Sequence, residues 1–135
     1  MKKIVLILML LISIGMKAQS PIPDGYYSVE LFRVIINDKD VITEPVNNTQ
    51  CFATVNDGSV FVVYMMNYPA ISCNMSEWVK GENGTTYFTA TEVHTGFKST
   101  SGINALEDGK TFHVVIGRGN GRSDVFTIKK IEVNQ

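Results

Sequence analysis

The chain has 135 residues and a formal net charge of −1, with 44% hydrophobic and 19% charged residues. This length is typical of one domain, and the hydrophobic content excludes an intrinsically disordered chain. The near balance of charge argues against binding of nucleic acid, which needs a surplus of basic residues.

The first 18 residues have the features of a secretory signal peptide. Lys2 and Lys3 precede the almost wholly apolar run Ile4–Ile14. This run is too short to cross a bilayer, which takes about 20 residues, and Ala18 is a small residue placed just before a polar start. We expect cleavage after Ala18 and no stable membrane anchor, although an uncleaved anchor is the alternative. The product, residues 19–135, is then exported to the periplasm or the extracellular medium with a formal charge of −4.

The rest of the chain alternates between strand-like runs and turn residues, and no apolar period of 3.6 residues predicts a helix. Val60–Met66 is apolar on both faces, which is typical of a strand covered on both sides. The pattern predicts an all-β fold, a single antiparallel β-barrel or β-sandwich of seven to eight strands. The expected strands, in chain order, are Tyr26–Ile36, Cys51–Val55, Val60–Met66, Thr85–His94, Lys110–Ile116 and Asp124–Val133, with less definite pieces at Val41–Thr43, Ile71–Lys80 and Phe97–Leu106.

Cys51 and Cys73 are the only cysteines, and both follow the predicted cleavage point. An even number of cysteines in an exported chain favours a disulfide, so we predict a Cys51–Cys73 bond. The alternative is a catalytic thiol, which needs a histidine partner. His94 and His113 are the only histidines that could supply one.

The glycine-rich segment Gly117–Gly121 superficially resembles a phosphate-binding loop, but such a loop needs a helix after it. Strands flank it here, and Asn120-Gly121 suits the positive φ angles of a hairpin turn. We therefore interpret the segment as a hairpin turn whose Arg118 and Arg122 could contact an anion or an acidic partner, and we take Arg118, Asn120 and Arg122 as a candidate partner-binding loop. The two isolated histidines predict no metal site, and no motif predicts a cofactor.

Several aromatic side chains are candidates for a ligand site, because amphipathic rings line pockets and anchor interfaces. If the fold is a barrel with a cavity, alternating inward positions would line it, including Phe52 and Val62. The alternative is that these rings simply fill the core. The ligand-binding candidates are Tyr64, Tyr68, Trp78, Tyr87 and Phe112.

Three short motifs resemble those of small bacterial lipocalin-like (calycin) domains. Gly25-Tyr26-Tyr27 opens the first strand, Asn56-Asp57-Gly58 forms an early hairpin, and Val125–Lys130 closes the chain. Tyr27 replaces the tryptophan of the family's G-x-W element, and Lys129 or Lys130 would stand for its basic residue. The resemblance implies a cupped barrel with an apolar interior and a binding role.

Three functions compete at this stage. The first is an exported, non-catalytic binding protein that holds a small apolar ligand. The second is a protein-binding module, such as an inhibitor or immunity protein that blocks an envelope or extracellular hydrolase. The third is a hydrolase with a carboxylate pair drawn from residues such as Glu30, Glu77 and Glu92. We expect no enzyme activity and favour the first two.

Overall fold

The computed structural model describes residues 20–45, 51–65, 68–82 and 84–131. No helix occurs in this part of the chain, and therefore none that is long and apolar enough to cross a membrane. The predicted cleavage site after Ala18 lies outside the described residues. The nine strands are β1 (Gly25–Ile36), β2 (Lys39–Pro45), β3 (Cys51–Val55), β4 (Val60–Met65), β5 (Tyr68–Lys80), β6 (Thr85–Glu92), β7 (Lys98–Ala105), β8 (Thr111–Gly119) and β9 (Arg122–Lys130).

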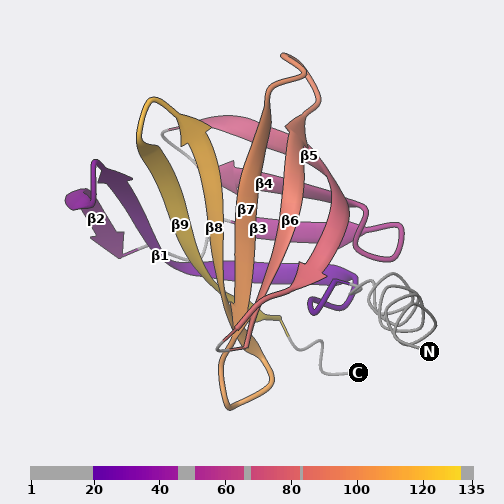
Figure 1. Cartoon of the computed structure of the whole chain (residues 1–135). Helices are drawn as coiled ribbons and strands as arrows, with labels where there is room; N and C mark the ends of the chain where they lie inside the picture. The colour runs from indigo at the N-terminus through magenta and orange to yellow at the C-terminus, as the bar shows by residue number, and fades with distance from the viewer. Residues whose placement is uncertain (1–19, 46–50, 66–67, 83, 132–135) are drawn as a thin grey trace, which may run out of the picture.

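Eight of these strands close into an antiparallel barrel (Figure 1). From β3 to β9 each strand pairs with the next, and β1 closes the ring by pairing with both β9 and β3. The pairing of β1 with β3 covers only Gly25–Ser28, and β2 continues along the same edge of β1 from Leu31 to Ile36. β2 is therefore an edge strand outside the ring. The predicted all-β antiparallel fold is confirmed, and of the two alternatives, barrel and sandwich, the structure is the barrel.

Tight turns with positive φ join neighbouring strands at the expected places. Asn120 and Gly121 have φ of 55° and 75° and connect β8 to β9, as the Asn-Gly pair predicted. Asn37 and Asp38, with φ of 51° and 65°, connect β1 to β2 in the same way. The segments that were ambiguous in the sequence, around Ile71–Lys80 and Phe97–Leu106, contain β5 and β7.

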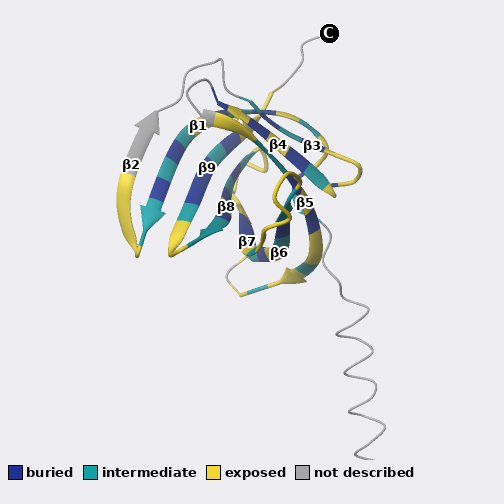
Figure 2. Cartoon of the chain, turned by 90° about the horizontal axis from the view of Figure 1, so that it is seen from above, coloured by how far each residue is buried: buried dark blue, intermediate teal, exposed yellow. Residues whose placement is uncertain are grey.

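Alternation along the strands directs one set of side chains inward, and Figure 2 shows the buried positions repeating along β1 and β9. Inside, six aromatic rings form a continuous chain whose neighbouring centroids lie 4.6–6.5 Å apart. Three of these five contacts are edge-to-face, which is a favourable arrangement for aromatic pairs. The rings, in order around the interior, belong to Phe112, Tyr27, Phe52, Phe61, Phe88 and Trp78.

The segment before β1 covers one end of the barrel, which we call the closed end. Ile22 is only 2% exposed, and the carbonyl oxygen of Pro23 accepts hydrogen bonds from the hydroxyls of Tyr27 (2.6 Å) and Thr54 (2.9 Å). The carboxylate of Asp24 accepts hydrogen bonds from two backbone amides of the β3–β4 turn, those of Asp57 (2.7 Å) and Gly58 (2.9 Å). Apolar burial and hydrogen bonds together attach this segment to the barrel.

The β4 strand corrects the expectation that it is covered on both sides. Phe61, Val63 and Met65 are at most 2% exposed and face inward, whereas Val62 and Tyr64 face outward and are 40% and 56% exposed. The outer face of this strand is apolar but lies in contact with solvent. A strand with apolar residues on both faces can therefore have its outer face in solvent, and the sequence pattern alone did not separate this case from a strand covered on both sides.

The predicted Cys51–Cys73 disulfide is wrong, because both cysteines are free. Cys51 lies on β3 opposite Tyr64, and Cys73 lies on β5 opposite Phe61, with β4 between them. Their Cα atoms are therefore separated by at least two strand spacings of roughly 4.8 Å each. A disulfide needs Cα atoms within about 6.8 Å. Cys73 also faces inward and is 2% exposed, whereas Cys51 alternates with inward Phe52 and faces outward.

Candidate functional site

The end of the barrel opposite the closed end contains a pocket of about 260 Å³, and we call this end the mouth. The β6–β7 and β8–β9 connections both lie here, at the top of Figure 1. Most of the pocket wall is apolar. Cys73, Ala90 and Ile116 supply buried wall positions, and Phe97 comes from the β6–β7 connection. The remaining lining residues are Glu92, Thr95, Ser99, Gly117 and Arg118.

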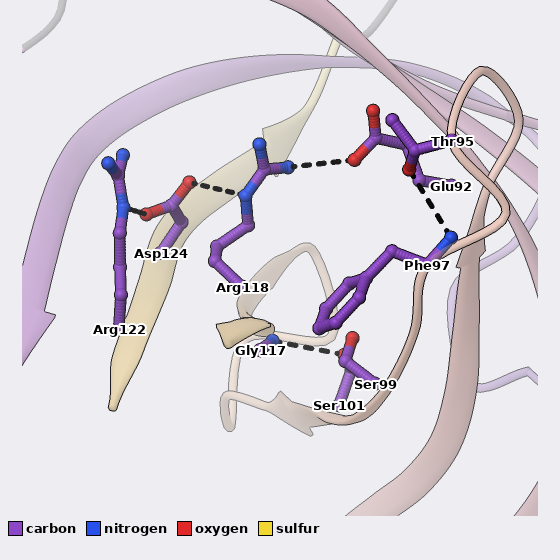
Figure 3. A network of polar contacts seen from close by, with 9 residues as sticks. All are labelled: Glu92, Thr95, Phe97, Ser99, Ser101, Gly117, Arg118, Arg122 and Asp124. Atoms are coloured by element: carbon purple, nitrogen blue, oxygen red, sulfur yellow. Dashed lines mark hydrogen bonds and ion pairs between the residues drawn. The ribbon is translucent and has the colours of Figure 1, made fainter. Parts of the chain in front are cut away.

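A row of four charged side chains crosses the mouth (Figure 3). Arg122 Nε donates a 2.9 Å hydrogen bond to Oδ1 of Asp124, whose side chain is only 2% exposed. Arg118 Nε lies 3.7 Å from Asp124 Oδ2, and Arg118 Nη1 lies 3.9 Å from Glu92 Oε2. Two cations and two anions alternate along this row, so their formal charges cancel.

The Arg118 guanidinium is only loosely held by its two partners. Both ion-pair distances exceed the 2.7–3.2 Å of an N–H···O hydrogen bond. A guanidinium carries five N–H donors. None of these donors makes a hydrogen bond to a described residue, so the Arg118 guanidinium keeps hydrogen-bonding capacity for a bound molecule.

A second, smaller pocket of about 110 Å³ lies on the other side of the Arg118–Glu92 pair. Both residues line both pockets, so the ion pair forms part of the partition between them. Phe32 and Met65 contribute apolar walls to this second space. The four charged side chains of the row also line this second space. The mouth therefore offers a mostly apolar pocket beside a smaller space of mixed polarity, with one charged pair between them.

The β6–β7 connection holds Phe97 at the edge of the larger pocket. The amide of Glu92 donates to the carbonyl of Phe97 (2.9 Å), and the amide of Phe97 donates to the hydroxyl of Thr95 (3.2 Å). The ring of Phe97 lies against Gly119, where a Cβ atom would come within 3.0 Å of it. Gly119 also has a φ of +85°, which glycine adopts readily. Because glycine has no side chain, the Phe97 ring can pack directly against the backbone of Gly119.

The Cys73 thiol lies in the wall of the same pocket. Burial, with a further contribution from the Glu92 carboxylate, raises the pKa of Cys73 to about 11. Arg118 partly opposes this shift. The thiol therefore stays protonated at neutral pH, and it behaves as a small apolar wall group with a weak S–H donor.

The structure separates the five predicted ligand-binding aromatics. Tyr64 and Tyr87 lie on the outer surface, 56% and 46% exposed, so neither lines the interior. Phe112 and Trp78 stand at the two ends of the aromatic chain in the core. Tyr68 begins β5, but its side chain lies outside the described part of the structure.

Other candidate positions are also distributed over different parts of the molecule. Phe52 is fully buried in the aromatic chain, and Val62 lies outside, so neither lines the mouth pocket. Glu30 accepts a hydrogen bond from a neighbouring serine on the surface, and Glu77 accepts one from Thr89 on the outer face. Of the three glutamates considered for a carboxylate pair, only Glu92 lies at the mouth.

The predicted partner-binding loop is smaller than its sequence suggested. Asn120 lies in an exposed two-residue turn, but Arg118 lines the mouth pocket and Arg122 is hydrogen-bonded to Asp124. The two arginines thus meet acidic side chains of the same chain. Their role in binding a partner stays a prediction.

Sequence reasoning missed Phe97 and Asp124 as site residues, and it considered Cys73 and Glu92 in other roles. One usable signal existed in the strand alternation. Glu92 continues the inward face of β6, and Asp124 precedes the inward Phe126 of β9. An acid at the end of an apolar face predicts a charged group at the rim of a barrel, because burial within the core would require a partner.

Within the described residues, no group of three His, Cys, Asp or Glu side chains could hold a metal ion. Comparison of the chain with protein-family models, with curated proteins and with solved structures found no match.

Proposed function

We propose that the protein is a non-catalytic binding protein that holds a small, largely apolar molecule in the mouth pocket. One observation carries this proposal: the aromatic chain fills the interior toward the closed end, whereas a pocket of about 260 Å³ remains at the mouth. Ligand sites are typically concave, mostly apolar and equipped with a few polar groups. The mouth pocket has this composition.

The size of the pocket limits the ligand. Pockets for drug-sized ligands measure about 300–1,000 Å³, so a pocket of about 260 Å³ suits a smaller molecule. Its apolar part would contact Ala90, Ile116 and Phe97, and its polar part would face Arg118 and Glu92. This arrangement orients a ligand with its polar group toward the charged row.

The resemblance to small bacterial lipocalin-like domains supports the same role. The closed eight-stranded antiparallel barrel agrees with that resemblance, and so does the segment that covers one end. We propose export after cleavage of residues 1–18 on the basis of the signal-peptide pattern.

The Cys73 thiol, whose pKa is raised to about 11, also favours binding over nucleophilic catalysis.

An inhibitor-like module is the second candidate, and the outer surface of the barrel favours it. Tyr26 on β1 is 70% exposed, and Val62 and Tyr64 on β4 are 40% and 56% exposed. Strand β3 lies between β1 and β4, and its Ala53 pairs with both Tyr26 and Val62. Exposed tyrosine side chains are common anchors of protein interfaces. The partner would then be a protein, and the mouth pocket would have no role.

The test is an NMR titration of the exported chain with 3-methylbutan-1-ol, a small apolar probe. We expect the largest amide shifts at Cys73, Ala90 and Ile116. Ala90→Leu should fill the pocket and weaken binding at least tenfold, because Ala90 is buried in its wall. Ala53→Leu is the matched control on the outward side of β3, and we expect it to bind within twofold of the unaltered protein.

Two results would count against the pocket as the site. Shifts confined to the outer face of β3 and β4 would favour the inhibitor-like module. Equal binding by Ala90→Leu and Ala53→Leu would show that the probe does not enter the mouth pocket.

A further inference from the structure

The four charges at the mouth are not equally satisfied. Asp124 is buried and hydrogen-bonded to Arg122 at 2.9 Å, so these two side chains compensate each other. Arg118 and Glu92 remain, with exposed fractions of 28% and 25% and a separation of 3.9 Å. They are the charged groups that face the larger pocket.

Neither member of this pair has its hydrogen-bonding capacity used. Within the described part of the chain, the carboxylate of Glu92 meets only Arg118, at a distance too long for a hydrogen bond. The side chain of Arg118 makes no hydrogen bond to any described residue either. The pocket therefore presents free donors and free acceptors side by side at its charged edge.

A ligand with a single charge fits this edge poorly. An anion bound to Arg118 would lie close to the Glu92 carboxylate, and a cation bound to Glu92 would lie close to Arg118. Both arrangements bring like charges together in a partly buried site, where screening by water is weak. A wholly apolar ligand would remove water from the ion pair without replacing its hydrogen bonds.

We propose that the ligand of this site is zwitterionic, an α-amino acid with an aliphatic side chain. This inference rests on the proposed function. The carboxylate of the ligand accepts hydrogen bonds from Arg118, its ammonium donates to Glu92, and its side chain enters the apolar part of the pocket between Ala90, Ile116 and Phe97.

Charge alternation supports this assignment. The order Arg118, ligand carboxylate, ligand ammonium and Glu92 places opposite charges next to each other, and the Arg118–Glu92 contact closes the ring of four. The protein pair need not separate, and the formal charge of the mouth is unchanged by binding. The two ligand charges are attached to one carbon atom, so they span a short distance that matches neighbouring protein partners.

The experiment is isothermal titration calorimetry of the exported chain with three ligands that share one side chain. L-Leucine carries both charges, 4-methylpentanoate lacks the ammonium, and L-leucinamide lacks the carboxylate. We expect L-leucine to bind at least tenfold more tightly than either relative. This comparison needs no altered protein, so it does not depend on whether a variant folds.

Two variants assign the charges to their partners. Glu92→Gln should weaken L-leucine binding while leaving 4-methylpentanoate unchanged or tighter, because the repelling carboxylate is gone. Arg118→Gln should weaken both L-leucine and 4-methylpentanoate. The matched control is Arg33→Gln, which breaks an exposed pair between Arg33 and Asp40 at 2.7 Å on another part of the barrel and should not alter binding.

Each contrary outcome has a distinct meaning. If 4-methylpentanoate binds as tightly as L-leucine, the ligand is an anion and the zwitterion proposal is overturned. If 3-methylbutan-1-ol binds more tightly than both, the ligand is apolar and only the charge assignment fails. If no member of the series binds and none shifts the pocket amides, the proposed function itself fails.

Discussion

The two cysteines differ in their surroundings, although both are free. Cys73 is 2% exposed inside the barrel, and its pKa is raised to about 11, whereas Cys51 lies on the outward side of β3. Thiolates, not thiols, react with electrophiles and disulfides. The location of each thiol in the barrel wall therefore controls its reactivity.

We predict that one thiol of the native protein reacts rapidly with a soluble aromatic disulfide at pH 8, and that the second reacts only after unfolding. Cys51→Ser should remove the rapid phase and change the free energy of unfolding by less than about 1 kcal/mol, because no disulfide is lost. Thiol titration with and without denaturant measures both phases.

The control is Cys73→Ser, which should retain the rapid phase. A mass deficit of two hydrogens in the intact protein, with no thiol titrated even in denaturant, would show that Cys51 and Cys73 are bonded after all.

Asp108 shows how a side chain can stabilise a turn while fully exposed. Its carboxylate accepts hydrogen bonds from the hydroxyl of Thr111 (2.6 Å) and from the amides of Lys110 and Thr111 (2.9 and 2.8 Å). These bonds, that of the Thr111 hydroxyl first, lower the pKa of Asp108 from 3.8 to about 2. The charged form is thus favoured in the folded protein.

Because the folded-state pKa is depressed, Asp108 stabilises the protein fully above pH 3.8 and loses this effect as the pH falls toward 2. We predict that Asp108→Asn lowers the melting temperature by a few degrees at pH 6, and that the difference shrinks between pH 4 and pH 2. Thermal unfolding at several pH values measures this. A difference that is the same at pH 6 and pH 2 would exclude the linkage.

At the scale of one strand, β4 shows what alternation means for stability. Phe61 is fully buried and stacks on Phe52 at 5.3 Å, whereas Tyr64, three residues later, points into solvent. We predict that Phe61→Ala lowers the free energy of unfolding by about 3–5 kcal/mol. Tyr64→Ala should lower it by less than about 1 kcal/mol. Urea denaturation of both variants measures the difference, and similar losses would contradict the direction that the structure gives these side chains.

Much of the element order follows from local sequence. Asn120-Gly121 predicts its hairpin because both residues tolerate positive φ, and Phe112, Val114 and Ile116 alternate on the inward face of β8 as expected. The faces of β4 were harder to assign, because valine and tyrosine occupy its outer side as well. Local pattern loses its value where both faces of a strand are apolar.

The charged row at the mouth is formed by residues from three different strands. Glu92 lies on β6 and Arg118 on β8, and strand β7 lies between these two strands in the sheet. Their side chains nevertheless come within 3.9 Å of each other. Asp124 lies near Arg118 because the β8–β9 hairpin pairs Asp124 with Ile116, two residues before Arg118. The closure of the ring and its register bring these charges together. The sequence alone singled out the two arginines, but in a loop for binding a partner and without the acidic side chains that they meet.

At the scale of the whole barrel, the two ends have different physical roles. The closed end is filled by the aromatic chain and covered by Ile22, and hydrogen bonds from Tyr27 and Thr54 hold that covering segment. The mouth contains open space, charged side chains and the half-exposed Phe97. Burial stabilises the first region, whereas the concave, mostly apolar wall of the second has the composition of a ligand site.

This division predicts opposite effects of truncation at the two ends. Ile22→Ala should lower the free energy of unfolding by about 2–5 kcal/mol, because Ile22 is 2% exposed, and should leave the affinity for 3-methylbutan-1-ol unchanged. Phe97→Ala should weaken that affinity several-fold, because the ring lines the pocket, and should cost less than about 1 kcal/mol of stability at 45% exposure. Urea denaturation and NMR titration of the same two variants test both halves of the prediction. If Phe97→Ala destabilises the protein more than Ile22→Ala does, Phe97 belongs to the folding core and stability is not concentrated at the closed end.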